Sequence, residues 1–308
     1  MKRILPTLSL VALSLYAAAC GGNDTPVAQV KVEPRDVRLV YPGVAPVRLS
    51  WTPVAPLGEG IEPMVFVHLL DDRDTVVRTF DHAFPQAWRE GTPVAYDVKL
   101  YQSALGEPLA PGKYRLTVGL YGKERKRWAL EGLGEDLGRN EYLAGEVRVP
   151  AQQQGPRFAF SQAWLPKEPG GDRQVLARRW VFKRGAIRVL DVKEPGSVWM
   201  VVRIPDASGG GEELVLDEGA KTPSLLVSGS CGSVETNVSG PGYHEIELPM
   251  EPPPAGQFCR ILLRPNFHMK PTGGPGRPRS VSLENIGWVS GPGQAKAEKP
   301  AAAAAAAP

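Results

Sequence analysis

The sequence predicts an all-β protein built from two β-sandwich domains, and three observations support this class. Short segments alternate apolar and polar residues with a period of two, as in residues 114–121, YRLTVGLY. The 34 Gly and 31 Pro are spread between such segments, where turns are needed. Beyond the N-terminal region, no long segment repeats apolar residues at the helical spacing. Many short strands separated by turn residues are typical of sandwiches and barrels.

The alternating segments fall into two groups. The first group predicts about seven strands over residues 30–150, which suits an immunoglobulin-like sandwich. The second predicts about eight strands over residues 157–290, which suits a jelly roll. The clearest segments are 47–51, 65–70, 94–100, 114–121 and 145–150 in the first group, and 186–190, 198–205, 225–229, 243–249, 259–265 and 281–289 in the second.

Residues 151–156 lie in the stretch PAQQQGP, which predicts a short, fairly extended linker with Pro at both ends. We therefore expect each sandwich to bury its own core and to unfold separately. The chain ends in a low-complexity Ala/Pro segment, residues 291–308. This segment has too few apolar side chains to form a core, so we expect it to be disordered.

The pattern of the N-terminal residues predicts an export signal. Lys2 and Arg3 precede a short apolar run over residues 4–16, which is too short to span a membrane. The run ends in Ala-Ala-Ala-Cys at residues 17–20, which resembles the bacterial lipobox. This resemblance implies a lipoprotein signal peptide over residues 1–19, acylation of Cys20 and a tether over residues 20–29. An ordinary secretory signal with a chance cysteine is the alternative.

Gly21 follows the cysteine, in place of the Asp that resembles an inner-membrane retention signal. The implied location is therefore the outer membrane, where the protein is held by its lipid, facing either the periplasm or the cell surface. The formal charge of +3 falls to +1 when Lys2 and Arg3 are removed with the signal. No clustered basic stripe is visible in the sequence, so we expect no nucleic-acid partner.

Two cysteines remain once Cys20 is acylated, and an exported chain with one such pair is a candidate for a disulfide. A bond between Cys231 and Cys259 would close a loop of 28 residues (259 − 231) and would contribute about 3 kcal/mol of stability. Two free buried thiols are the alternative.

Several motifs of the first domain stand in a recognisable order. They are a strand ending in His-Leu-Leu-Asp, an Asp-His pair, a Trp-x-x-Gly turn and Pro-Gly-x-Tyr-x-Leu-x-x-Gly-Leu-Tyr. The matching residues are His68, Asp71, Asp81, His82, Trp88, Gly91, Pro111, Tyr114, Gly119 and Tyr121. This order resembles the β-sandwich module appended to bacterial membrane glycosyltransferases of the dolichyl-phosphate mannosyltransferase type.

The second domain is similar to jelly-roll modules of the galactose-binding-like type, which often accompany the same glycosyltransferases. The similar segments are residues 160–168, 177–180, 260–271 and 277–288. Neither resemblance includes a catalytic motif, and nothing in the chain resembles the glycosyltransferase catalytic domain.

Asp81, His82 and Trp88 lie within a few residues of each other and form the candidate ligand site. An indole face beside an acid and an imidazole suits a sugar ring, whose C–H face stacks while its hydroxyls find polar partners. Trp128 lies near another loop and is the second aromatic candidate. A structural turn is the alternative for this site, and a hydrogen-bonded structural role is expected for His68.

No enzyme is predicted. The four histidines form neither His-x-His nor His-Glu-x-x-His, so no metal site is expected. The chain has no Gly-x-Ser-x-Gly elbow and no phosphate-binding loop, and no cofactor is expected.

The sequence thus predicts a lipid-anchored, non-catalytic binding protein of the cell envelope, with a glycan ligand linked to surface-polysaccharide assembly. A structural subunit that docks on other envelope proteins is the alternative. A glycan-processing enzyme is the least favoured reading.

Overall fold

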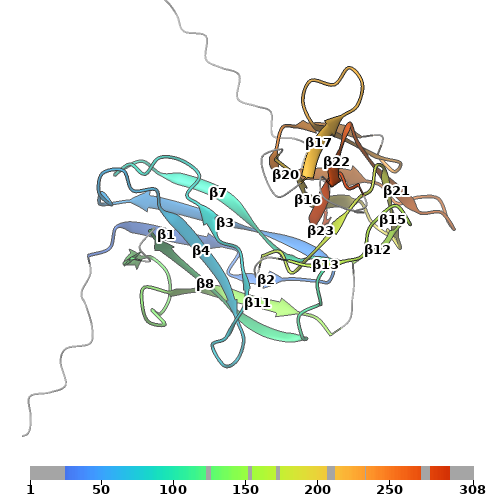
Figure 1. Cartoon of the computed structure of the whole chain (residues 1–308). Coiled ribbons are helices and arrows are strands. Elements are labelled where there is room, and N and C mark those ends of the chain that lie inside the picture. The colour runs from blue at the N-terminus through green and yellow to red at the C-terminus, as the bar shows by residue number, and fades with distance from the viewer. Residues whose placement is uncertain are drawn as a thin grey trace, which may run out of the picture.

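The computed structural model confirms the all-β prediction. It describes residues 25–291 except 123–125, 152–154, 171–173, 207–211, 233 and 272–277, and these residues form strands and no helix. The signal peptide, Cys20, most of the linker and nearly all of the Ala/Pro tail lie outside the described residues. In the part of the chain described, no helix is long and apolar enough to cross a membrane. Figure 1 shows two groups of strands, one coloured blue to green and the other yellow to red.

The first sandwich contains two facing layers. One layer is part of a nine-stranded sheet in which β1 pairs with β3 and β10, and β3 pairs with β7. The other is a seven-stranded sheet with the order β2-β11-β8-β4-β5, extended by β6 and β9. Its strands are β1 (Ala28–Glu33), β2 (Asp36–Arg38), β3 (Gly43–Pro53), β4 (Met64–Leu70), β5 (Val76–Thr79), β6 (His82–Ala83), β7 (Val94–Gln102), β8 (Gly112–Tyr121), β9 (Arg127–Trp128), β10 (Leu130–Glu131) and β11 (Tyr142–Val149).

Two details of this sandwich are typical of immunoglobulin-like domains. The chain leaves β1 in one sheet and enters β2 in the other, where β2 runs parallel to β11. Near the start of β8, the Tyr114 hydroxyl donates a hydrogen bond to the carbonyl of Ala110 at 2.7 Å. A tyrosine that hydrogen-bonds to backbone a few residues upstream is the tyrosine corner of that fold. The Pro-Gly-x-Tyr motif thus has a structural function.

The second sandwich also contains two layers. One is the rest of the nine-stranded sheet, in which β16 pairs with β20 and β23, and β14 joins β23 to β13. The other is a five-stranded sheet with the order β12-β15-β21-β18-β19, and β17 and β22 form a separate ribbon. Its strands are β12 (Arg157–Phe160), β13 (Glu168–Pro169), β14 (Ala177–Trp180), β15 (Gly185–Leu190), β16 (Gly196–Ile204), β17 (Glu212–Leu216), β18 (Ser224–Gly229), β19 (Glu235–Ser239), β20 (Gly242–Met250), β21 (Cys259–Pro265), β22 (Phe267–Pro271) and β23 (Ser282–Ser290).

Each sandwich has its own hydrophobic core. The first core joins side chains such as Val30 of β1 and Val47 of β3 to Leu116 of β8. The second joins Val198 of β16 to Ile261 of β21. These residues alternate along their strands with polar ones that face outward, as the sequence pattern indicates.

The two sandwiches are joined by much more than a linker. β3 and β23 meet as parallel neighbours at Val44 and Val289. The segment after β7 crosses to the second sandwich, where the Ala104 N–H donates to the Ile286 carbonyl at 2.8 Å. Leu105, which is 2% exposed, belongs to the second core although it follows a strand of the first sandwich.

Side chains reinforce this junction. Tyr101 of β7 packs on Trp199 of β16 with 4.9 Å between ring centroids, and its hydroxyl donates to the Gln174 carbonyl at 3.0 Å. Lys99 of β7 forms ion pairs with Glu245 and Glu247 of β20. The contacts therefore predict coupled unfolding of the two sandwiches, in contrast to the separate unfolding expected from the linker sequence.

We expect wild-type protein to unfold in one cooperative transition, and Leu105→Ala to destabilise the whole by about 2–5 kcal/mol, the usual cost of truncating a buried leucine. Chemical denaturation followed by fluorescence and circular dichroism measures the number of transitions and the free energy of unfolding. Val54→Ala is the control, because Val54 is 41% exposed and its truncation should change the free energy of unfolding by less than about 0.5 kcal/mol. Two separate transitions in wild-type protein, with only one shifted in Leu105→Ala, would contradict coupling.

Candidate functional site

Asp81 and His82 lie where the chain passes from β5 to β6, two short strands that pair with β4. Both nitrogens of His82 are engaged. Its Nδ1–H donates to the Phe80 carbonyl at 2.9 Å, and the Tyr96 hydroxyl donates to its Nε2 at 2.7 Å. Burial lowers the pKa of His82 below its ordinary value. A neutral imidazole with both nitrogens engaged inside the protein has no hydrogen bond left for a sugar.

The two candidate tryptophans are also held by the protein itself. The half-buried Trp88 donates its indole N–H to the Ala55 carbonyl at 3.0 Å, and its ring packs on Phe84 at 5.0 Å. Trp128 is 7% exposed and belongs to the first core. The prediction that Trp128 offers a ring face to a ligand is therefore wrong: β9 turns it inward against β8. Asp81, His82 and Trp88 point to different partners, so they do not form one ligand face.

Asp81 instead contributes to a charged cluster around His68 of β4. The His68 Nε2 lies 3.4 Å from Asp81 Oδ1, and its Nδ1 lies 3.1 Å from Glu141 Oε1. Glu141 also accepts a hydrogen bond from the Thr117 hydroxyl at 2.8 Å and forms an ion pair with Arg127 at 3.3 Å. The cluster joins β4 and β8 to the residue that precedes β11.

The cluster shifts the protonation of both central groups. Burial alone would lower the pKa of His68, but the hydrogen bonds and charges of Asp81 and Glu141 together outweigh it and raise that pKa. Burial alone would raise the pKa of Glu141. The hydrogen bonds from His68 and Thr117, with the charges of His68 and Arg127, outweigh it and lower this pKa to about 2. His68 therefore carries its positive charge between two carboxylates more readily than a free histidine does.

Aromatic packing covers this cluster on the outer face of the seven-stranded sheet. The Phe66 ring stacks on His68 at 4.8 Å, and the Arg127 guanidinium lies 4.4 Å from the centre of the Phe66 ring. Gly119 is directly opposite Phe66 on β8, and a Cβ there would lie only 2.0 Å from a Phe66 ring carbon. Glycine is thus required for Phe66 to cover this face. His68 is only 9% exposed and hydrogen-bonded to the protein itself, which agrees with the structural role expected for it.

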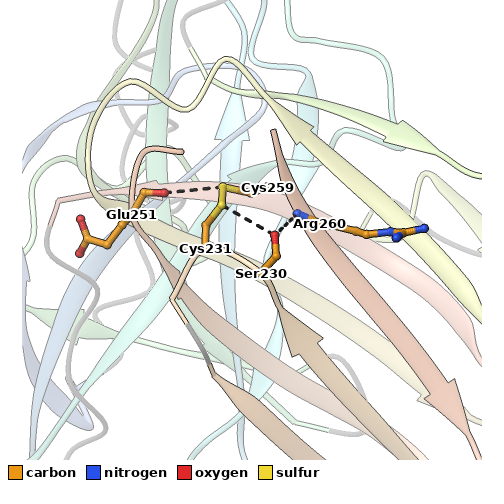
Figure 2. Close-up of a disulfide and its surroundings, with 5 residues drawn as sticks. All are labelled: Ser230, Cys231, Glu251, Cys259 and Arg260. Carbon is orange, nitrogen blue, oxygen red and sulfur yellow. Dashed lines mark hydrogen bonds between the residues drawn. A yellow bond between two sulfur atoms is a disulfide. The ribbon is translucent and has the colours of Figure 1, made fainter. Parts of the chain in front are cut away.

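The structure joins Cys231 and Cys259 in a disulfide, with 5.4 Å between the Cα atoms (Figure 2). The bond links the loop after β18 to the first residue of β21. Next to it, the Arg260 N–H donates to the Ser230 hydroxyl at 2.8 Å, which fixes the same loop. Figure 2 shows these residues with Glu251, whose carbonyl lies 3.6 Å from the Cys259 sulfur.

We expect Cys231→Ala/Cys259→Ala to lower the free energy of unfolding by about 3 kcal/mol, because the link closes a loop of 28 residues in the unfolded chain. Denaturation of the variant and of wild-type protein gives the difference. Thiol labelling of unfolded, unreduced wild-type protein should find neither cysteine reactive. Two labelled cysteines in that experiment would show that the protein lacks the bond.

Four arginines form a group on the outer face of the five-stranded sheet that was not predicted from the sequence. The register of β15 and β21 places Arg188 directly opposite Arg260, with Ala186 opposite Leu262 beside them. Gly185 is opposite Leu263, so continuing the register by one residue places Arg184 opposite Arg264. We name Arg184, Arg188, Arg260 and Arg264 the arginine quartet.

All four side chains of the quartet are exposed, and none of them forms an ion pair with a carboxylate of the described residues. Three of them line a shallow groove of about 400 Å³ whose floor includes Ala186 and Leu262. The fourth, Arg188, lies over the ring of Phe258 at 5.0 Å, and that ring is 42% exposed. The face combines exposed positive charge with an apolar floor.

Among the described residues, no three His, Cys, Asp or Glu side chains are arranged to hold a metal ion.

No protein-family model matches the chain, and no curated protein is similar enough to it in sequence to count as a relative.

Proposed function

We propose that this chain is a lipid-anchored, non-catalytic binding protein of the bacterial outer membrane, and that its ligand is a glycan of the cell envelope. The observation that carries the proposal is the lipobox-like Ala-Ala-Ala-Cys at residues 17–20, together with its distance from the fold. The first strand begins at Ala28, eight residues after Cys20. Eight extended residues span at most about 28 Å, so the acylated cysteine holds the sandwiches close to the membrane surface.

The fold supports binding more than catalysis. Sandwiches and jelly rolls present ligand surfaces on a rigid frame, and here the disulfide and the junction of the two sandwiches make that frame stiffer. The titratable groups with the clearest cluster lie around the buried His68, where they pair with one another across strands and serve the fold. The arginine quartet is an accessible charged surface with binding chemistry, and among the described residues its groove lining contains the Ser161 hydroxyl but no His, Asp, Glu, Lys or Cys that could activate it.

One observation favours the second candidate, a structural subunit that docks on an envelope protein. Within the described residues, β20 pairs on one side only, with β16, and it carries Tyr243, which is 63% exposed. A sheet edge with an exposed aromatic residue is a docking site for a strand of another protein.

A glycan array separates the two candidates. We expect the purified mature chain to bind a restricted set of envelope glycans, and a pull-down from solubilised envelope to return no stoichiometric protein. An array without binding, combined with one stoichiometric protein partner in the pull-down, would replace the first candidate by the second. In that case Tyr243→Ser should release the partner, whereas Phe182→Ser, at another exposed aromatic residue, should not.

A further inference from the structure

The arginine quartet is unfavourable for the isolated fold. Arg188 and Arg260 are directly opposite on neighbouring antiparallel strands, and like charges at such positions are destabilising. Arg184 and Arg264 repeat the arrangement at the other end of the groove. The only side-chain hydrogen bond that a quartet guanidinium makes within the described residues is a long one, from Arg264 to the Ser228 hydroxyl at 3.5 Å. An external anion would remove this repulsion.

The spacing of the quartet indicates an extended anion with several charges. Arg260 and Arg264 lie four residues apart on one strand, which places their Cα atoms about 13 Å apart, while paired strands are about 5 Å apart. A single small ion bound at one arginine pair would leave the other pair without a partner. Arginine forks bind carboxylate and phosphate groups through two parallel hydrogen bonds. The ligand should therefore carry such groups at intervals along a chain.

The floor of the groove indicates what lies between those anionic groups. Ala186 and Leu262 form an apolar strip between the arginine pairs, and Phe258 adds an exposed aromatic ring at one end. Apolar strips and aromatic rings suit the C–H faces of sugar rings. The location also favours a polymer over a lipid surface: in Figure 1, β15 and β21 lie at the opposite end of the molecule from β1, where the tether to the membrane joins.

We propose that the arginine quartet binds an acidic polysaccharide, with carboxylate or phosphate groups of the chain held by the two arginine pairs and sugar rings lying on Ala186 and Leu262. This inference rests on the proposed function, because it names the class of glycan and the surface that binds it.

The test uses the mature chain carrying Cys20→Ser, so that binding is measured without the lipid. The probes are polygalacturonate for carboxylate, phosphomannan for phosphate, neutral dextran, and vesicles of phosphatidylcholine with phosphatidylglycerol. The variant is Arg260→Gln/Arg264→Gln. The matched control is Arg73→Gln/Arg89→Gln, which removes the same charge from two exposed arginines of the first sandwich.

We expect polygalacturonate, phosphomannan or both to bind, and we expect salt to weaken this binding. Dextran should not bind. The quartet variant should bind about tenfold or more weakly, and the control within about twofold of the parent. The thermal midpoint of the quartet variant should equal or exceed that of the parent, because a repulsion is removed. If this variant does not fold, Arg184→Gln/Arg188→Gln makes the same test from the other strand.

Equal weakening in the quartet variant and the control would show that only net charge attracts the polymers, and would overturn the inference. Quartet-dependent binding to the anionic vesicles without binding to either polymer would also overturn it, since the face would then contact a membrane. If the quartet variants leave binding unchanged while the array still detects a glycan, the inference fails and the proposed function stands. An array without any glycan ligand removes the proposed function as well.

Discussion

Replacing Cys20 by Ser is expected to move the protein almost completely from the membrane fraction to the soluble fraction. In the proposed lipoprotein the Cys20 thiol accepts diacylglycerol, and a serine would not. Stable anchoring needs the combined burial of several acyl chains, at about 0.8 kcal/mol for each CH₂. Fractionation of cells that express the variant, with mass spectrometry of its N-terminal peptide, measures both location and acylation.

Cys231→Ser is the matched control, because it removes a cysteine that lies in the folded domain and leaves the lipobox intact. It should remain in the membrane fraction with fatty acid on Cys20. A Cys20→Ser protein that still carries fatty acid and partitions into detergent would show that the anchor lies elsewhere. An ordinary secretory signal would also be revealed, because wild-type protein would then be soluble and free of lipid.

Replacing His68 by Gln is expected to destabilise the first sandwich by about 3–5 kcal/mol near pH 5.5. Removing one partner of a largely buried ion pair is strongly destabilising. Here Asp81 and Glu141 would lose their common partner, although Glu141 would keep Arg127 and Thr117. Urea denaturation of wild-type protein and of His68→Gln gives the difference. Glu146→Gln is the control, because Glu146 forms its ion pairs with Lys113 and Arg148 at the surface, where solvent and salt screen them, so its loss should change stability much less.

The pH dependence follows from the two pKa shifts of the cluster. The raised pKa of His68 gives stability that is complete below its ordinary value of 6.5 and is lost as pH rises through the folded value. The pKa of Glu141, lowered from 4.5 to about 2, gives stability that is complete above pH 4.5 and is lost as pH falls towards 2. The difference between wild-type and His68→Gln protein should therefore be largest between about pH 4.5 and 6.5. An equal difference at pH 3, 5.5 and 8.5 would show that His68 contributes packing alone.

The sequence was sufficient to predict the fold class, because strand alternation is a local pattern. Tyr114 illustrates this: its motif, its strand and its hydrogen-bond partner, Ala110, all lie within a few residues. The same locality misled the interpretation of Trp128. A tryptophan in a two-residue strand beside a loop is expected at the exposed edge of the sandwich. The pairing of β9 with β8 instead places the indole in the core.

The remaining features depend on residues that are distant in the sequence. His68 meets Glu141, which follows it by 73 residues, and no local pattern indicates this contact. Leu105 joins a core whose other members come later in the chain, so the linker alone suggested independent domains. In the arginine quartet, Arg184 and Arg188 lie four residues apart in one segment of the chain, and Arg260 and Arg264 lie four residues apart in another. That spacing places each pair on one face of a strand and was the available signal, although only the pairing of β15 with β21 brings the pairs together.

The central claim is that the protein binds a polysaccharide of the envelope without changing it. The most direct test is to place the acylated protein in vesicles and to incubate them with polysaccharide extracted from the envelope of the cells that produce the protein. Two quantities are measured: the amount of polysaccharide that sediments with the vesicles, and the chain length of the polysaccharide recovered. We predict that the polysaccharide sediments with the protein and is recovered with its chain length unchanged. Recovery of shortened or extended chains would contradict the absence of catalysis, and polysaccharide that stays in solution would contradict binding.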